Sequence, residues 1–300
     1  MTLRGFRFVS DKAMQVTKAS GERERYAPAK VMESLTRSGV SPDEAKRIER
    51  SIAREITPGD STTELFERVR KRLMETDIAG AARYSLKQAI MELGPEGYYF
   101  ERYVAHVLEK YGYRTKTNQM TQGACVSHEI DIVAEEPMSK EKHSAGIPVT
   151  YLIEVKYHNA RGVKTDVKEA MYAYARVLDV QEGRKGVPYG TWLVTNTKFT
   201  ENAKRYGACR GVRLTGWRHA HPGGTEESLE RLIEHWGLYP VTIFPGVSRA
   251  GRIALADGGV YFAYELLGKD ARELQKRFGI TEHDAAGVYA GVTALFGTHA

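Results

Sequence analysis

The first third of the chain combines two short extended stretches with apolar residues at helical spacing. Residues 15–18 and 22–26 flank a Ser20–Gly21 turn signal and predict a small hairpin. Beyond Pro28, apolar side chains recur every three or four residues in segments that begin near positions 28, 41, 62 and 78. Residues 12–94 therefore predict a hairpin followed by a bundle of four helices.

Local signals give the ends of these helices. Ser41, with Pro42 behind it and Glu44 three residues on, forms the pattern of a capping box, and Thr62 or Thr63 is expected to cap the third helix. The fourth helix is expected over 78–93. The Gly94–Gly97 stretch contains Pro95 and is the clearest domain boundary.

The middle of the chain alternates between helical and strand-like patterns. The pattern predicts helices over 98–111, 164–180 and 200–208, and strands over 113–118, 127–134, 149–157, 190–195 and 211–217. This order of elements indicates an α/β fold in which helices flank a mixed sheet.

The last part of the chain predicts helices over 225–237 and 260–298, with a turn at Gly279. The three predicted regions are 12–95, 96–222 and 223–300. The Phe278–Glu282 run is typical of the turn between two helices, and a helix-hairpin-helix there would present backbone N–H groups to a phosphate. The net charge of −3 over residues 222–300 favours a packing or oligomerisation appendage instead.

Charge is concentrated where the sheet is predicted. The net charge is +6, to which residues 1–97 contribute +3 and residues 98–221 contribute +6. A basic surface suits a phosphate-backbone partner, although a mildly basic solvated face would look the same. Two cysteines form neither a disulfide framework nor a zinc site. With no signal peptide and no long apolar run, a cytoplasmic protein without membrane contact is expected.

Three charged residues interrupt the apolar strands of this middle region. Asp131 lies in the run Glu129–Ala134, and Glu154 and Lys156 end the run that begins at Tyr151. Because strand side chains alternate, Glu154 and Lys156 point to the same side. Two carboxylates and an ammonium group can hold Mg²⁺ and activate water, which is the equipment of phosphodiester hydrolysis. Charges at strand ends are also common without any chemistry.

Residues 96–220 resemble the PD-(D/E)XK restriction-endonuclease-like superfamily, in particular its Mrr-like branch. The resemblance depends on Phe100–Glu101, the runs around Asp131 and Glu154, and Val194–Thr200. It implies that Asp131 and Glu154 ligate Mg²⁺ or Mn²⁺, that Lys156 assists the attacking water, and that Glu101 lies at the edge of the site. One departure is Ile130, which stands where the family often has proline.

His128, His158 and Lys164 flank these runs. Each is either a phosphate or metal-water contact or a solvated surface residue.

Residues 14–97 resemble the ATP-cone, a nucleotide-sensing domain, on Val16–Lys18, Gly21, Glu24, Lys30, Ser34–Leu35 and Thr62. The resemblance implies that ATP or dATP binds at Lys18, Glu24, Lys30 and Thr62. Two lysines and the start of a helix could converge on a triphosphate. Ala19 stands where the family often has a second basic residue.

The leading hypothesis is a metal-dependent DNA endonuclease with an ATP- or dATP-sensing domain. The alternative is a non-catalytic, nucleotide-regulated DNA-binding regulator. No GxxxxGK[ST] loop is present, so nucleotide-driven translocation is not expected. Double-strand cutting would favour a homodimer. A junction resolvase, a methylation-dependent restriction enzyme and a repair nuclease all remain open.

Overall fold

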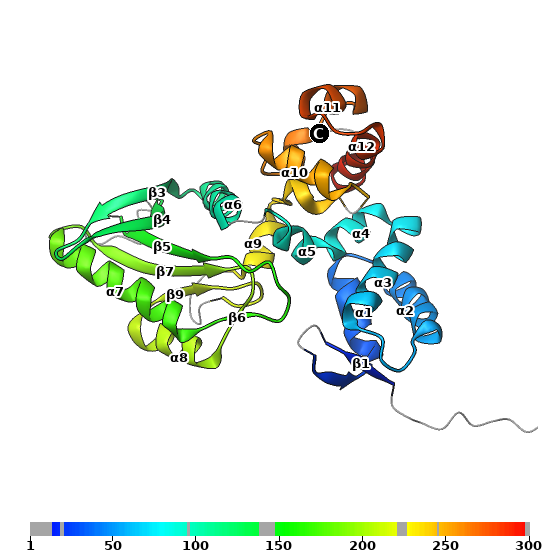
Figure 1. Cartoon of the computed structure of the whole chain (residues 1–300), viewed down its shortest axis with the longest axis horizontal. Coiled ribbons are helices and arrows are strands. Elements are labelled where there is room, and N and C mark those ends of the chain that lie inside the picture. The colour runs from blue at the N-terminus through cyan, green and yellow to red at the C-terminus, as the bar shows by residue number, and fades with distance from the viewer. Residues whose placement is uncertain are drawn as a thin grey trace, which may run out of the picture. The chain divides into compact units, whose positions relative to one another are not determined.

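A computed structural model describes residues 14–18, 21–94, 97–137, 148–220, 227–244 and 246–297 (Figure 1). The chain divides into two units, Met1–Tyr84 and Ser85–Ala300. This division falls ahead of the predicted Gly94–Gly97 boundary, of which Pro95 and Glu96 lie outside the described residues, as does Ala19. No helix in the described ranges is long and apolar enough to cross a membrane.

The first unit begins with the predicted hairpin. Strands β1 (Gln15–Thr17) and β2 (Arg23–Arg25) pair antiparallel. The helices that follow are α1 (Pro28–Arg37), α2 (Pro42–Glu55), α3 (Thr62–Thr76) and α4 (Ile78–Tyr84). Their inward faces bury an apolar core that includes Leu35, Ile52 and Leu73, each fully buried. Burial of these faces removes apolar surface from water and holds the short helices together.

Two details of the first unit differ from the predictions. Ser61, and not Thr62 or Thr63, caps α3, because Glu64 stands three residues after Ser61 and completes a reciprocal capping box. The helix predicted over 78–93 is broken at Ser85 into α4 and α5 (Leu86–Met91). Tyr84 stacks on Phe66 of the first unit at 5.0 Å, whereas Leu86 is buried in the second.

The second unit contains the predicted mixed sheet, with strand order β3-β4-β5-β7-β9. The strands are β3 (Arg114–Gln122), β4 (Ser127–Glu135), β5 (Thr150–Lys156), β7 (Tyr189–Thr195) and β9 (Arg213–Thr215). The first three pair antiparallel, and β5, β7 and β9 run parallel. This arrangement confirms the α/β class with a mixed sheet at its centre.

Helices cover this sheet. Helix α7 (Val167–Gly183) and α8 (Glu201–Arg210) pack along one face, where Ala170, Leu193 and Leu214 share a buried cluster (Figure 1). Helix α6 (Gly97–Lys110) contacts β3, β4 and β5.

The helix predicted from residue 164 starts later. Lys164–Thr165 forms a short strand, β6, which pairs parallel with β8 (Lys198–Phe199). Asp166 then caps α7 by accepting the N–H of Val167 at 2.7 Å. Thr165 is buried in this strand pair, and the next residue, Asp166, is the N-cap of α7. The helix therefore cannot begin before Val167.

The C-terminal part of the second unit contains an α-helix, α10, and a short 3-10 helix, η1, that the pattern did not predict. Its elements are α9 (Leu229–His235), η1 (Val241–Ile243), α10 (Arg249–Asp257), η2 (Ala263–Leu266), α11 (Ala271–Phe278) and α12 (Glu282–Phe296). Helix α10 was missed because it is short, Gly251 interrupts its apolar period, and Gly246 and Gly258 stand close to its two ends. Gly279 forms the predicted turn, with a left-handed φ of 64°.

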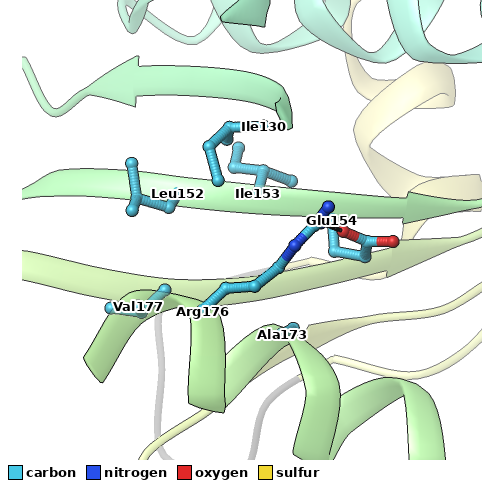
Figure 2. Close-up of a pocket in the computed structure, with 7 residues that line it drawn as sticks. All are labelled: Ile130, Leu152, Ile153, Glu154, Ala173, Arg176 and Val177. Atoms are coloured by element: carbon cyan, nitrogen blue, oxygen red, sulfur yellow. Dashed lines mark hydrogen bonds and ion pairs between the residues drawn. The ribbon is translucent and has the colours of Figure 1, made fainter. Parts of the chain in front are cut away.

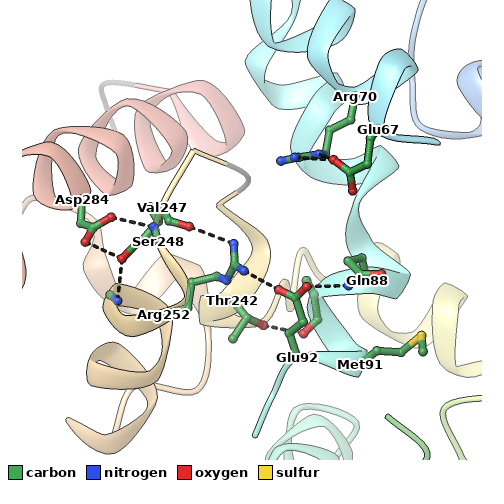
Figure 3. Close-up of polar contacts among 12 residues, drawn as sticks. Glu67, Arg70, Gln88, Met91, Glu92, Thr242, Val247, Ser248, Arg252 and Asp284 are labelled. Carbon is green, nitrogen blue, oxygen red and sulfur yellow. Dashed lines mark hydrogen bonds and ion pairs between the residues drawn. The ribbon is translucent and has the colours of Figure 1, made fainter. Parts of the chain in front are cut away.

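This C-terminal part is bonded to the helices before the sheet. Thr242 donates to the carbonyl of Ala89 at 2.6 Å, and Arg252 pairs with Glu92 at 2.7 Å (Figure 3). The fully buried Tyr103 of α6 donates to the carbonyl of Leu238 at 2.5 Å. The first two contacts join the C-terminal part to α5 and the residue after it, and the third joins it to α6.

Candidate active site

Asp131 lies where two central strands part. The antiparallel ladder between β4 and β5 runs from the Glu135–Thr150 pair to the Ile132–Ile153 pair. At the next position, Oδ2 of Asp131 accepts the backbone N–H of Val155 at 2.7 Å. The Asp131 carboxylate therefore accepts a bond that a backbone carbonyl of β4 would otherwise accept in the ladder. This bond to β5 fixes the position of the carboxylate.

Glu154 is enclosed by two cations. It is 6% exposed and accepts from Lys156 through Oε1 at 2.7 Å and from Arg176 of α7 through Oε2. Figure 2 shows the Arg176 side chain extending from α7 to the Glu154 carboxylate. Beside them lies a cavity of about 10 Å³, room for one water at most. Glu154 is thus tightly packed and electrostatically neutralised on its α7 side.

The compensation of Asp131 and Glu101 by Lys156 and other neighbours is smaller than the cost of their burial. Burial raises the pKa of Asp131 to about 6, and the charge of Glu154 adds to the effect. Burial likewise raises the pKa of Glu101, on α6, to about 7, with further contributions from Asp131, Glu154 and Glu129. A group of acids that all repel one another in a partly buried place has an excess of negative charge that a cation would relieve.

Lys156 remains a cation. Burial alone would lower the pKa of its ammonium group, but the hydrogen bond and charge of Glu154 and the charge of Glu169 outweigh burial and raise it. Lys156 Nζ lies 3.4 Å from the Glu169 carboxylate in the first turn of α7. Lys156 is therefore positioned between two acids and carries its proton at neutral pH.

A buried polar network holds the end of β5. The hydroxyl of Thr195 donates to the carbonyl of Lys156 at 2.8 Å and lies 2.9 Å from the hydroxyl of Thr165. The side chain of Asn196, which is fully buried, accepts the N–H of His158 at 2.9 Å and donates to its carbonyl at 2.8 Å. These bonds join the ends of β5 and β7, so the backbone of Lys156 is fixed.

The three flanking residues have different surroundings. His158 belongs to the buried network through a 3.0 Å contact with Thr165, and burial lowers its pKa. His128 pairs with Asp179 of α7 at 2.7 Å, in a group that also bonds the N–H of Cys125. Lys164 is exposed on β6. Two of the three flanking side chains therefore have partners within the fold.

Arg176, Glu169 and Glu129 contribute to the site and were missed from the sequence. Glu169 and Arg176 stand seven residues apart, a spacing that places both on one face of a helix. Glu129 precedes Asp131 by two residues on β4, which places both on one face of the strand. Helical and strand spacing could have suggested these neighbours. That α7 packs over β5 could not be read from either pattern.

The residues predicted to bind nucleotide also gather, in the first unit. Lys18 lies 3.3 Å and Lys30 lies 2.9 Å from Oε2 of Glu24. The hydrogen bond from Lys30 is the main cause of a lowered pKa at Glu24. Thr62 is the first residue of α3, next to Ser61, which bridges to Thr17 at the end of β1. The hairpin and the start of α3 are therefore adjacent.

Across the described ranges, no group of three or more His, Cys, Asp or Glu side chains is arranged to hold a metal ion. The candidate donors are the two carboxylates of Asp131 and Glu154. Mg²⁺ is commonly bound through one or two carboxylates and completes its octahedron with waters and substrate phosphates. The donor set fits such an ion.

Comparisons with known proteins identify the family of the domain that contains this site. Residues 94–216 match the family Mrr_cat, described as restriction endonuclease. An uncharacterized protein of Archaeoglobus fulgidus is 38% identical over 194 residues, which are 65% of this chain and 100% of that protein. The crystal structure of AF1548, a protein of unknown function, is 38% identical with a TM-score of 0.51, covering 67% of this chain and 99% of that one.

A complex of the MspJI restriction endonuclease with a 27-mer oligonucleotide is 20% identical, with a TM-score of 0.32, over 46% of this chain and 29% of that chain. A likeness of this strength has no bearing on function.

Proposed function

The chain belongs to one family with the Archaeoglobus fulgidus protein and contains a restriction-endonuclease-like domain at residues 94–216, and on that premise we propose that it is a divalent-metal-dependent DNA endonuclease. The observation that supports this best is the meeting of Asp131, Glu154 and Lys156 at the end of β5. Two carboxylates and a protonated lysine in one partly buried place provide the groups that phosphodiester hydrolysis needs.

Asp131 and Glu154 would hold Mg²⁺ or Mn²⁺. Each carboxylate has about four lone-pair positions, so the bond of Asp131 to the Val155 N–H and the two bonds of Glu154 to Lys156 and Arg176 leave room for a metal ion. The bound ion would supply Lewis-acid stabilisation of the phosphate and a more acidic water. Burial, and after it the repulsion of neighbouring acids, raises the pKa of Asp131 and Glu101, and both effects favour a cation in the working protein.

The roles of Lys156 and Glu101 follow from their charge states. Lys156 keeps its proton, so it donates to a phosphate oxygen and stabilises negative charge as it develops in the transition state. Glu101, with a pKa of about 7, is suited to exchange a proton with the attacking water near neutral pH. Arg176, on α7, pairs with the Glu154 carboxylate and holds it in position.

We assign nucleotide sensing to the first unit. Lys18 and Lys30 approach Glu24 from two elements, and the start of α3 is adjacent. A triphosphate could replace Glu24 as the partner of both ammonium groups. ATP or dATP would regulate cleavage only by binding two arrangements of the protein with different affinity.

The experiment is cleavage of supercoiled, linear and single-stranded DNA by the purified protein with Mg²⁺, Mn²⁺ or EDTA, each with and without ATP and dATP. We expect nicking or cutting that EDTA abolishes, and a change in its rate with nucleotide. A nucleotide effect that persists when Lys30 is changed to Ala would contradict the assignment to the first unit. Absence of cleavage, with DNA still retarded in a gel, would instead support a non-catalytic DNA-binding regulator.

Metal binding should depend on pH. In the folded, metal-free protein the pKa of Asp131 is about 6 and that of Glu101 about 7, above their ordinary values of 3.8 and 4.5. These acids therefore reduce stability progressively as pH rises from about 4 to about 7, because ionisation is costlier in the folded state. Mg²⁺ competes with protons for the same oxygens. Differential scanning fluorimetry should show a larger rise in Tm with Mg²⁺ at pH 8 than at pH 5.5.

The matched control is the Asp131→Asn variant in buffers of equal ionic strength, where the Mg²⁺-dependent rise should be small at both pH values. Equal rises in the wild type and the variant would mean that the ion binds elsewhere.

A further inference from the structure

Four basic side chains from separate segments gather beyond the ends of β5 and β7, outside the residues assigned to chemistry. They are Lys87 of α5, Arg161 between β5 and β6, Lys198 of β8 and Arg218 after β9, here called the basic cluster. Burial lowers the pKa of Lys87, and the charges of Lys198, Arg218 and Arg161 lower it further. The charge of Glu230 has the opposite effect and raises the pKa of Lys87.

Hydrogen bonds explain why these segments meet. Arg161 donates to the side-chain oxygen of Gln88, next to Lys87 on α5. The N–H of Trp217 donates to the carbonyl of Thr197 at 2.8 Å, which joins the segment that contains Arg218 to the segment that contains Lys198. The cluster is therefore built by the fold and does not depend on one flexible side chain.

The balance of charge in the cluster is unfavourable for the protein alone. Glu230 is already engaged by Arg218 through two bonds of 2.7 and 2.9 Å. Lys87 is partly buried among the other cations, which costs both desolvation and repulsion. An arrangement that opposes stability in this way is typical of a binding site for the opposite charge.

The cluster lies at the same end of the sheet as the candidate active site. The ends of β5 and β7 are joined by the bonds between His158 and Asn196. Arg161 is the fifth residue after Lys156, so their Cα atoms are at most about 17 Å apart. Since phosphates of one strand recur about every 3.4 Å along a duplex axis, this distance is within about five nucleotides.

We propose that the basic cluster binds a backbone phosphate of duplex DNA a few nucleotides from the phosphate that is cut, and so sets the position of the strand in the active site. This inference rests on the proposed nuclease function for its substrate. The contact is to the phosphate and not to a base, so it supplies affinity and register without sequence specificity.

The test is fluorescence anisotropy of a short labelled duplex in EDTA, where no metal-dependent cutting occurs. The Lys198→Gln variant is compared with Lys276→Gln, which removes the same charge from an exposed lysine on α11. We expect Lys198→Gln to weaken binding about ten-fold and to reduce the slope of log affinity against log salt by about one, while Lys276→Gln stays close to the wild type. Equal behaviour of the two variants overturns the proposal, and so does failure of the wild type to bind at low salt.

A second variant separates a binding role from a structural one. Lys87→Met removes the most buried cation of the cluster and keeps the length of an unbranched side chain. We expect its Tm without DNA to rise by about 2 °C or more because repulsion and desolvation are relieved, while DNA binding weakens. A variant that binds DNA like the wild type overturns the proposal, whatever its Tm.

Cleavage assays keep this inference distinct from the proposed function. If the wild-type protein binds DNA through the cluster but never cuts it, the proposed nuclease function is wrong and the proposed phosphate site stands. Wild-type protein that cuts, with cluster variants that bind and cut equally well, would remove the phosphate site alone.

Discussion

Asp131→Asn is expected to lower the rate of metal-dependent DNA cleavage by about a thousand-fold or more, because a metal contribution of several kcal/mol to the barrier is lost with one charged ligand. The fold should persist. Asparagine has the same shape as aspartate, and its side-chain oxygen can still accept the N–H of Val155, the bond that Asp131 makes at 2.7 Å. Initial rates of plasmid nicking with Mg²⁺ and Mn²⁺ measure the loss.

The matched control is Asp179→Asn, an aspartate on α7 that bonds His128 and the N–H of Cys125 and is not among the proposed catalytic residues. This variant should cut at a rate close to the wild type. Far-UV circular dichroism and Tm show whether Asp131→Asn is folded. A folded Asp131→Asn protein that cuts like the wild type would exclude Asp131 from catalysis.

Arg176→Met should destabilise the second unit by about 2–3 kcal/mol, because it leaves the buried Glu154 with one cation in place of two. Removing one partner of a buried ion pair costs more than the pair contributes, since the remaining charge stays desolvated. Lys156 still pairs with Glu154, which keeps the loss below that of a fully orphaned carboxylate. Chemical denaturation monitored by tryptophan fluorescence measures the change in the free energy of unfolding.

Lys168→Met provides the comparison, because it removes a cation from an exposed position of the same helix and should change the stability by less than about 0.5 kcal/mol. The double variant Glu154→Gln/Arg176→Met should lose less than the sum of the two single variants, since neither partner is then left charged and alone. An additive loss would show that the two side chains do not interact in solution.

The sheet was predictable because its signal is local. Apolar runs bounded by turns gave β4, β5 and β7, and strand alternation placed Glu154 and Lys156 on one side of β5, where the structure has them in contact. Short elements were not predictable in this way. Strand β6 has two residues and exists only because it pairs with β8.

The rest of the candidate site depends on tertiary packing. Arg176 reaches Glu154 because α7 packs across β5, and the sequence contains no pattern that reports which helix covers which strand. Asp131 accepts a backbone N–H because β4 pairs with β5 only from Ile132 onward, which is a property of the two strands together. The roles of Asp131, Glu154, Lys156 and Glu101 in catalysis stay predictions.

Because α6 contacts the C-terminal part, the residues that fold together extend beyond those that form the candidate active site. Glu101 stands on a helix whose buried Tyr103 bonds Leu238, and whose neighbour α5 is bonded by Thr242. A fragment trimmed to the matched residues 94–216 would keep every proposed catalytic group and lose these bonds. The Tyr103 hydroxyl would then lack its acceptor. Helix α6, which carries Glu101, would be held only by its contacts with the sheet. The described residues after 220 thus hold α6 in position, although none of the proposed catalytic residues lies among them.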